Sequence, residues 1–167
     1  MLAETGQFLS YSPAETRQLG ARLGALLQPG DLVCLQGELG AGKTTLVQGL
    51  AAGWGAQDAV SSPTFVIVNL YRHPNGGQLY HLDTYRLTSL PEAEELDLDG
   101  LLAAGPLVVE WPERLAGLLP TERLWVKLTD LAIEERQITF EATGERYLQL
   151  LKSILANQKS KIKNQKS

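Results

Sequence analysis

The sequence predicts a three-layer α/β fold built on a mixed, partly parallel sheet to which antiparallel strands are added. Two observations predict this class: short, continuously apolar runs alternate with helical patterns, and a glycine-rich loop joins one of these runs to a helix. The chain has 167 residues, of which 44% are apolar. A chain of this size can form one domain with its own core, without disulfides or a structural metal.

The first predicted elements are a helix and a buried strand. Ser12 is suited to cap the helix, Pro13 fits its first turn, and Glu15 completes a capping box. The apolar positions of this helix run out before Pro29, which ends it. Leu32–Gln36 then forms a short apolar run of the kind that is buried on both faces of a parallel sheet.

After the glycine-rich loop, residues 44–52 are predicted to be helical, and the segments 65–71 and 78–82 are predicted to be strands. Asn75 and Gly76 lie between these strands and form a strong hairpin signal, so the two strands are expected to pair antiparallel. One helix is expected from Ser89 to about residue 104.

The C-terminal part is predicted to contribute three more strands and a last helix, at Leu107–Glu110, 123–131, 137–143 and 145–156. We expect residues 1–156 to form a single domain. Residues 157–167 contain four lysines, no acidic residue and no apolar period, and we expect this tail to be disordered.

Composition restricts the classes of partner and compartment. The formal net charge is −4, but residues 1–156 alone carry 11 basic and 19 acidic residues. Such an acidic domain is a poor surface for DNA or RNA. The single cysteine, Cys34, lies in an apolar strand and is expected to be a buried thiol. The N-terminus has no signal-peptide pattern, and no apolar run is long enough to span a membrane, so we expect a cytoplasmic protein.

The segment GELGAGKTT, residues 37–45, matches the phosphate-binding pattern G-x-x-x-x-G-K-[ST] and lies between a predicted strand and a predicted helix. The glycines let successive N–H groups face phosphate oxygens, at the positive end of the following helix dipole. Lys43 is expected to reach the outer phosphates, and the Thr44 hydroxyl is expected to bind Mg²⁺. The expected nucleotide-binding residues of the loop are Gly37, Glu38, Leu39, Gly40, Ala41, Gly42, Lys43, Thr44 and Thr45.

A magnesium nucleotide also requires an acidic residue at the end of a neighbouring strand. Asp83 and Glu110 each follow an apolar run, and from the residues alone either one could hold the metal or orient the attacking water. His81 lies on the same strand face as Asp83, and with only His73 for company it is expected to be a hydrogen-bonded structural histidine. The guanine-reading N-K-x-D pattern is absent, which favours adenine by elimination.

Four ordered motifs together resemble the TsaE family, also called YjeE, the small P-loop ATPases of bacterial tRNA threonylcarbamoyladenosine synthesis. The motifs are GELGAGKTT (37–45), VSSPTF (60–65), YHLDTYR (80–86) and VEWPE (109–113). The resemblance extends from about residue 12 to residue 143 and implies a P-loop NTPase-like fold.

The resemblance implies a weak intrinsic ATPase that uses ATP and Mg²⁺ and acts with the TsaD and TsaB proteins. It implies that tRNA is met only indirectly, through that complex. In these positions Lys43 would bind phosphate, Thr44 and Glu110 would bind the metal, Asp83 would serve hydrolysis, and Trp111 would lie near the nucleotide. The segment 61–65 would be a nucleotide-sensing switch.

Two alternatives remain open at this point. A small-molecule kinase uses the same loop, metal and acidic residue, although only Arg72, Arg86 and Arg114 lie near the motifs to bind an acceptor. A nucleotide-sensing module that needs no hydrolysis has the same loop as well. That module predicts that loss of the Asp83 carboxylate leaves biological activity intact.

Overall fold

The computed structural model describes residues 2–38, 40–60, 68–87, 89–115 and 117–166, and the side chains of these residues as far as residue 156. Seven strands form one mixed sheet in the order β1-β7-β6-β2-β5-β4-β3. The strands are β1 Ala3–Ser10, β2 Leu32–Gln36, β3 Val68–Arg72, β4 Gln78–Asp83, β5 Leu107–Glu110, β6 Arg123–Asp130 and β7 Arg136–Thr143. The predicted mixed α/β architecture is therefore confirmed.

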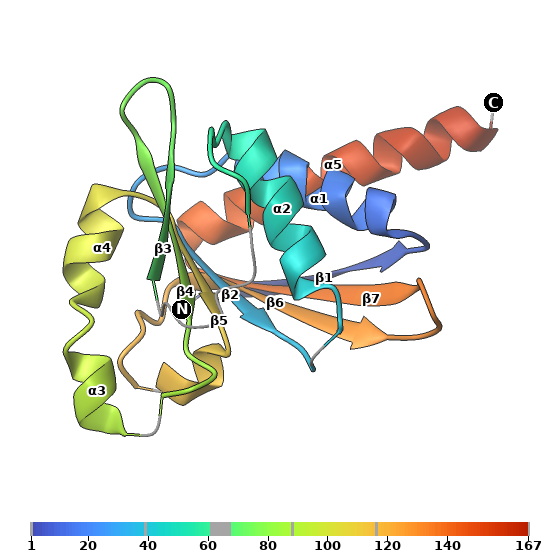
Figure 1. Cartoon of the computed structure of the whole chain (residues 1–167). Coiled ribbons are helices and arrows are strands. Elements are labelled where there is room, and N and C mark those ends of the chain that lie inside the picture. The colour runs from blue at the N-terminus through green and yellow to red at the C-terminus, as the bar shows by residue number, and fades with distance from the viewer. Residues whose placement is uncertain (1, 39, 61–67, 88, 116, 167) are drawn as a thin grey trace.

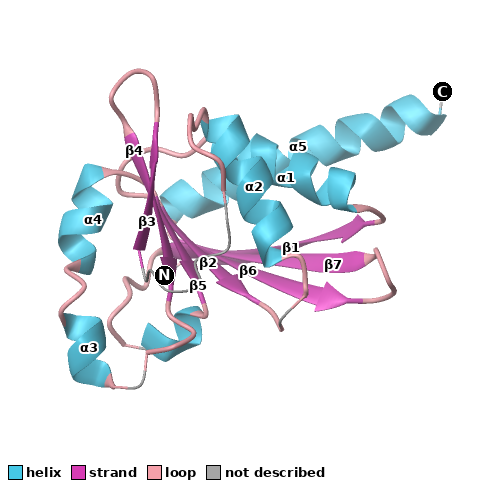
Figure 2. Cartoon of the chain, in the orientation of Figure 1, coloured by secondary structure: helices cyan, strands magenta, loops and turns pink. Residues whose placement is uncertain are grey.

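The helices cover the two faces of the sheet unequally (Figures 1 and 2). α1, α2 and α5 lie on one face, and α3 and α4 lie on the other, beside β3, β4 and β5. The helices are α1 Pro13–Gly24, α2 Lys43–Trp54, α3 Leu90–Glu94, α4 Leu98–Ala104 and α5 Glu145–Lys166, with a 3₁₀ turn at Pro112–Leu115.

The central strands are buried on both faces, as their continuous apolar runs predict. In β2, Val33 and Leu35 pack into the core under α1, α2 and α5. Leu32 and Cys34 point the other way, into the core under α3 and α4. Cys34 is fully buried, which confirms the prediction for this thiol.

The parallel part of the sheet places the carboxyl ends of several strands side by side. β2 pairs in parallel with β5 and β6, and β5 also pairs in parallel with β4. The antiparallel pairs β3–β4, β6–β7 and β1–β7 extend the sheet at its two sides. Ligands of open α/β sheets bind beyond such carboxyl ends, so this edge is where a site is expected.

Local sequence signals explain several boundaries. The Ser12 hydroxyl accepts a hydrogen bond from the Glu15 N–H at 3.2 Å, and the Glu15 carboxylate accepts one from the Tyr11 N–H at 2.7 Å. The predicted cap by Ser12 is thus confirmed, but Glu15 accepts from the N–H of the residue before the cap, and not from the Ser12 N–H as in a capping box. The hairpin between β3 and β4 is confirmed as well, with Gly76 at φ 93° and its N–H donating to the His73 carbonyl at 2.9 Å.

Three features differ from the prediction. β1 was not predicted, and it pairs with β7 along its whole length. The single helix expected over 89–104 is wrong, because Asp97 adopts φ 50°, breaks the helix and caps α4 by accepting from the Gly100 N–H at 3.3 Å. The backbone of α5 continues past residue 156 to Lys166, and in Figure 1 its last turns project away from the sheet. The domain end at residue 156 stays a prediction.

The first part of the strand expected over 65–71 and the segment 61–65 lie outside the described residues. In the part of the chain that the structure describes, no helix is long and apolar enough to cross a membrane.

Candidate nucleotide-binding site

The glycine-rich loop connects β2 to α2, as the sequence predicts. Gly40 and Gly42 have φ angles of 83° and 98°, a region of backbone space that residues with a Cβ rarely adopt. Gly42 is the N-cap of α2 and supplies no side chain to the first turn of that helix. The free N–H groups at this helix end can therefore face an anionic ligand. Leu39 lies outside the described residues.

Lys43 is the first residue of α2 and is only 6% exposed. Its Nζ donates a hydrogen bond to the Gly37 carbonyl at 2.6 Å and lies 3.9 Å from the ring centroid of Trp111. Burial lowers the pKa of Lys43, and the negative charges of Glu110 and Asp83 oppose this shift. The ammonium is thus held over the loop, where a phosphate would supply a better counter-charge than a carbonyl and a ring.

Asp83 and Glu110 end the neighbouring parallel strands β4 and β5 and are directly paired in register. The Asp83 carboxylate is half-buried and accepts a hydrogen bond from the Tyr85 N–H at 2.9 Å. Burial is the main cause that raises the pKa of Asp83, with the charge of Glu110 adding to it. The two predicted carboxylates therefore lie together at the edge where the loop begins.

Glu110 differs from Asp83 because it is almost fully buried and firmly held. Glu110 is 4% exposed, and its Oε2 lies 2.8 Å from Nε2 of the buried His81. The other ring nitrogen of His81 lies 3.0 Å from the Tyr71 hydroxyl. The expectation of a hydrogen-bonded structural histidine is confirmed. The partner of His81 is Glu110 on the neighbouring strand β5. The alternation of side chains along β4, which places His81 on the same face as Asp83, did not indicate this partner.

Trp111 follows Glu110 in an unusual backbone conformation, with φ 59°. The buried Thr84 hydroxyl donates hydrogen bonds to the carbonyls of Glu110, at 2.9 Å, and of Trp111. The Trp111 ring also lies 4.9 Å from the ring of Tyr85. These contacts hold the Trp111 ring over Lys43, beside the loop, where the resemblance placed it near the nucleotide.

The loop also borders a cavity of about 410 Å³ on the side of β6. A cavity of this size falls in the range of small-ligand sites. Neither Asp83 nor Glu110 lines this cavity, so the cavity extends the candidate site away from these two carboxylates. The lining residues include Gly37, Glu38, Ala41, Trp111, Glu113 and Lys127.

Thr44 and Thr45 follow Lys43 in the first turn of α2 and are half-buried. Among the described residues, no three histidine, cysteine or carboxylate side chains gather into a group that could hold a metal by themselves. The assignment of Thr44 and Glu110 to Mg²⁺ stays a prediction. Mg²⁺ is commonly held by one or two protein oxygens, with water and substrate phosphates completing its shell.

Sequence reasoning missed one residue of the loop's surroundings. Arg136, at the start of β7, donates hydrogen bonds to the carbonyls of Gly40 and Ala41, both at 3.1 Å. Nothing in the spacing of the motifs indicates this contact, which joins residues 95 or more positions apart.

Comparisons with known proteins agree on one family. The family model for threonylcarbamoyl adenosine biosynthesis protein TsaE matches residues 10–138. The chain is 47% identical to the tRNA threonylcarbamoyladenosine biosynthesis protein TsaE of Streptomyces coelicolor, over 84% of the chain and 99% of that protein. It is 40% identical to the protein of the same name from Bacillus subtilis, over 87% of the chain and 90% of that protein.

The fold agrees with a solved structure as well. The crystal structure of Bacillus subtilis YdiB superposes with a TM-score of 0.78 at 32% sequence identity, covering 95% of this chain and 99% of that one.

Proposed function

The chain belongs to the TsaE family, and from this premise we propose that it serves tRNA threonylcarbamoyladenosine biosynthesis by binding and hydrolysing ATP with Mg²⁺. One observation carries the proposal. The phosphate-binding loop, with its buried lysine, lies at the same sheet edge as two carboxylates on adjacent parallel strands. Phosphoryl-transfer sites need these parts: a loop and a lysine for phosphates, a metal site, and an acid for the nucleophile.

The different settings of the two carboxylates support different roles for them. Glu110 is buried and held by His81, which suits an oxygen that has to stay in place beside Mg²⁺ with Thr44. Asp83 is half-buried, and its carboxylate accepts a hydrogen bond from the backbone N–H of Tyr85. We assign Asp83 to the attacking water.

In hydrolysis, water attacks the γ-phosphorus, the bond from that phosphorus to the β,γ-bridging oxygen breaks, and ADP and phosphate form. The carboxylate of Asp83, whose pKa is raised, would orient the water and accept its proton. Lys43 would leave the Gly37 carbonyl and donate to the phosphates. Mg²⁺ would neutralise phosphate charge when bound.

The proposed partners are the TsaD and TsaB proteins, and tRNA would be met through their complex. The acidic composition of residues 1–156 supports this indirect contact, because an acidic surface repels the phosphates of a nucleic acid. The proposed compartment is the cytoplasm, where these partners and ATP would be available.

The test is tRNA modification in a system reconstituted with TsaD, TsaB and a source of threonylcarbamoyl-adenylate. Lys43→Ala should abolish ATP binding and stop modification. Lys152→Ala removes an exposed lysine of α5 as a matched control and should leave both unchanged. Full modification with Lys43→Ala would refute the proposal.

Asp83→Asn separates hydrolysis from sensing in the same assay. An ATPase predicts that this variant binds ATP but no longer supports modification, since the water loses its base. A sensing module predicts full modification, and a kinase predicts a phosphorylated acceptor in place of free phosphate.

A further inference from the structure

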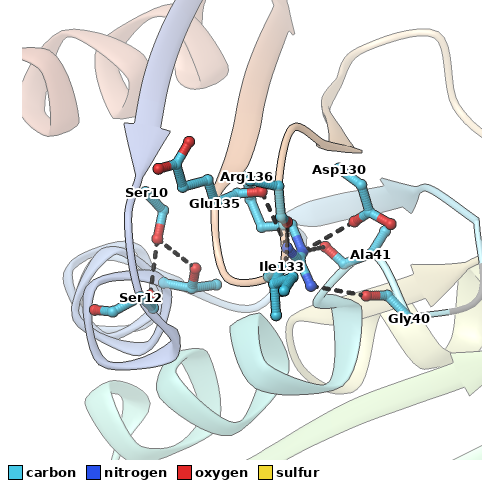
Figure 3. A network of polar contacts seen from close by, with 10 residues as sticks. Ser10, Ser12, Gly40, Ala41, Asp130, Ile133, Glu135 and Arg136 are labelled. Atoms are coloured by element: carbon cyan, nitrogen blue, oxygen red, sulfur yellow. Dashed lines mark hydrogen bonds and ion pairs between the residues drawn. The ribbon is translucent and has the colours of Figure 1, made fainter.

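Arg136 lies where the turn between β6 and β7 meets the phosphate-binding loop (Figure 3). Its Nε donates to the Ala41 carbonyl and its Nη2 to the Gly40 carbonyl, each at 3.1 Å. Its Nη1 donates to three carbonyls of the turn, at 3.0–3.2 Å: those of Ala132, Ile133 and Glu135. One side chain thus bridges two backbone segments that are distant in sequence.

The loop needs such a donor for a geometric reason. A phosphate-binding loop turns successive N–H groups inward, toward the anion, so its carbonyls point outward. Gly40 and Ala41 precede α2, so their carbonyls do not take part in the hydrogen bonds of that helix and need other donors. Arg136 donates to both, and two donors on one planar group fix the relative orientation of the two carbonyls.

The environment of Arg136 favours this role over direct contact with a ligand. The side chain is only 16% exposed, and Asp130 lies 3.0 Å from its Nε. Every nitrogen of the guanidinium has a carbonyl or carboxylate partner in the structure. The charge is therefore already balanced, and the donors are engaged with the loop and the turn.

We propose that Arg136 is a positioning residue for nucleotide binding: it holds the Gly40–Ala41 backbone in the conformation that presents the loop N–H groups to the phosphates of ATP. This inference rests on the proposed function, because it assumes that the loop binds ATP. It assigns to the turn between β6 and β7 a part in nucleotide affinity, although no residue of that turn belongs to the phosphate-binding motif.

The test compares Arg136→Lys with two controls by titrating each purified variant with ATP and Mg²⁺. Arg136→Lys keeps the charge but has no planar pair of donors. Arg123→Lys makes the same change at the opposite end of β6, where the guanidinium contacts the Pro120 carbonyl and the Trp125 ring. Lys43→Ala supplies the non-binding reference.

We expect Arg136→Lys to weaken ATP binding about tenfold, as for the loss of one or two charge-assisted hydrogen bonds. Arg123→Lys should stay within about twofold of wild type. In steady-state turnover Arg136→Lys should raise KM more than it lowers kcat, because Asp83 and Glu110 are untouched. Thermal unfolding identifies a temperature at which every variant is folded, and the titrations are run below it.

The outcomes separate this inference from the proposed function. If wild type binds ATP and Lys43→Ala does not, but Arg136→Lys binds as wild type does, then the inference is wrong and the function stands. A lower Tm for Arg136→Lys with unchanged ATP affinity would show a merely structural role and would also overturn the inference. If wild type itself fails to bind ATP, both fail.

Discussion

Replacing His81 by leucine should destabilise the fold strongly, because it removes the hydrogen-bond partner that the described part of the chain supplies to the buried Glu110 carboxylate. His81 is 1% exposed and Glu110 is 4% exposed, with 2.8 Å between Nε2 and Oε2. Removing one member of a buried polar pair costs about 3–5 kcal/mol, and the apolar leucine offsets a small part of this. We expect a loss of about 3 kcal/mol, which corresponds to a fall in Tm of roughly 6–12 °C for a chain of this size.

The assay is urea unfolding followed by circular dichroism, with two companion variants. Tyr71→Phe removes the second hydrogen bond of His81, leaves its contact with Glu110 in place and should cost about 1 kcal/mol. The double variant His81→Leu/Glu110→Leu removes both polar groups and should be more stable than His81→Leu alone. A free energy of unfolding for His81→Leu within about 1 kcal/mol of wild type would show that the contact between His81 and Glu110 contributes little to stability.

Three further predictions concern the core. Gly24→Ala should cost about 3 kcal/mol in urea unfolding, because a Cβ there would overlap the Leu50 carbonyl oxygen and force α1 from α2; an unchanged midpoint would contradict this contact. Arg146→Ala should also cost about 3 kcal/mol, because it removes the guanidinium that lies 2.8 and 3.0 Å from the two carboxylate oxygens of the buried Asp31, which is 4% exposed. A wild-type Tm for Arg146→Ala would contradict this prediction. Burial raises the pKa of Cys34 from 9.0 to about 12, so the folded thiol keeps its proton while the unfolded thiol ionises, and stability should fall as pH rises from 9.0 toward 12. Cys34→Ala should make that fall less steep, and native-state labelling of the thiol as fast as in urea would show that it is not buried.

Those parts of the fold that depend on local signals could be predicted from the sequence. The cap at Ser12, the apolar strand Leu32–Gln36 and the hairpin at Gly76 each depend on residues within a few positions of one another. The loop glycines belong to the same class, since Gly40 and Gly42 adopt the positive φ angles for which glycine is required. In each case the residues that form the sequence pattern are the same residues that determine the local backbone conformation.

Features that depend on distant partners could not be predicted. β1 is an edge strand with most of its residues exposed, and it exists through its pairing with β7, more than 120 positions away. The break at Asp97 depends on a left-handed backbone conformation. Aspartate tolerates this conformation, but an aspartate in the sequence does not by itself predict it. An otherwise continuous helical pattern over 89–104 concealed this break.

The candidate site likewise has features that the sequence indicates and features that depend on residues distant in the chain. Asp83 and Glu110 were predictable because strand ends next to a phosphate-binding loop share one sheet edge, and the parallel register places them opposite each other. The hydrogen bonds from His81 to Glu110 and from Arg136 to Ala41 join different elements. Neither His81 nor Arg136 belongs to a sequence motif that indicates its partner, so only the three-dimensional structure shows which groups these side chains hold in place.

The most direct test of the proposed function is ATP turnover by the purified chain, measured alone and with TsaD and TsaB, with Lys43→Ala as the blank. The proposed function predicts slow turnover by the chain alone, a clear rise with the two partners, and none with Lys43→Ala in either condition. Equal turnover with and without the partners would contradict the proposed coupling. Equal turnover by Lys43→Ala and wild type would contradict the assignment of the loop itself.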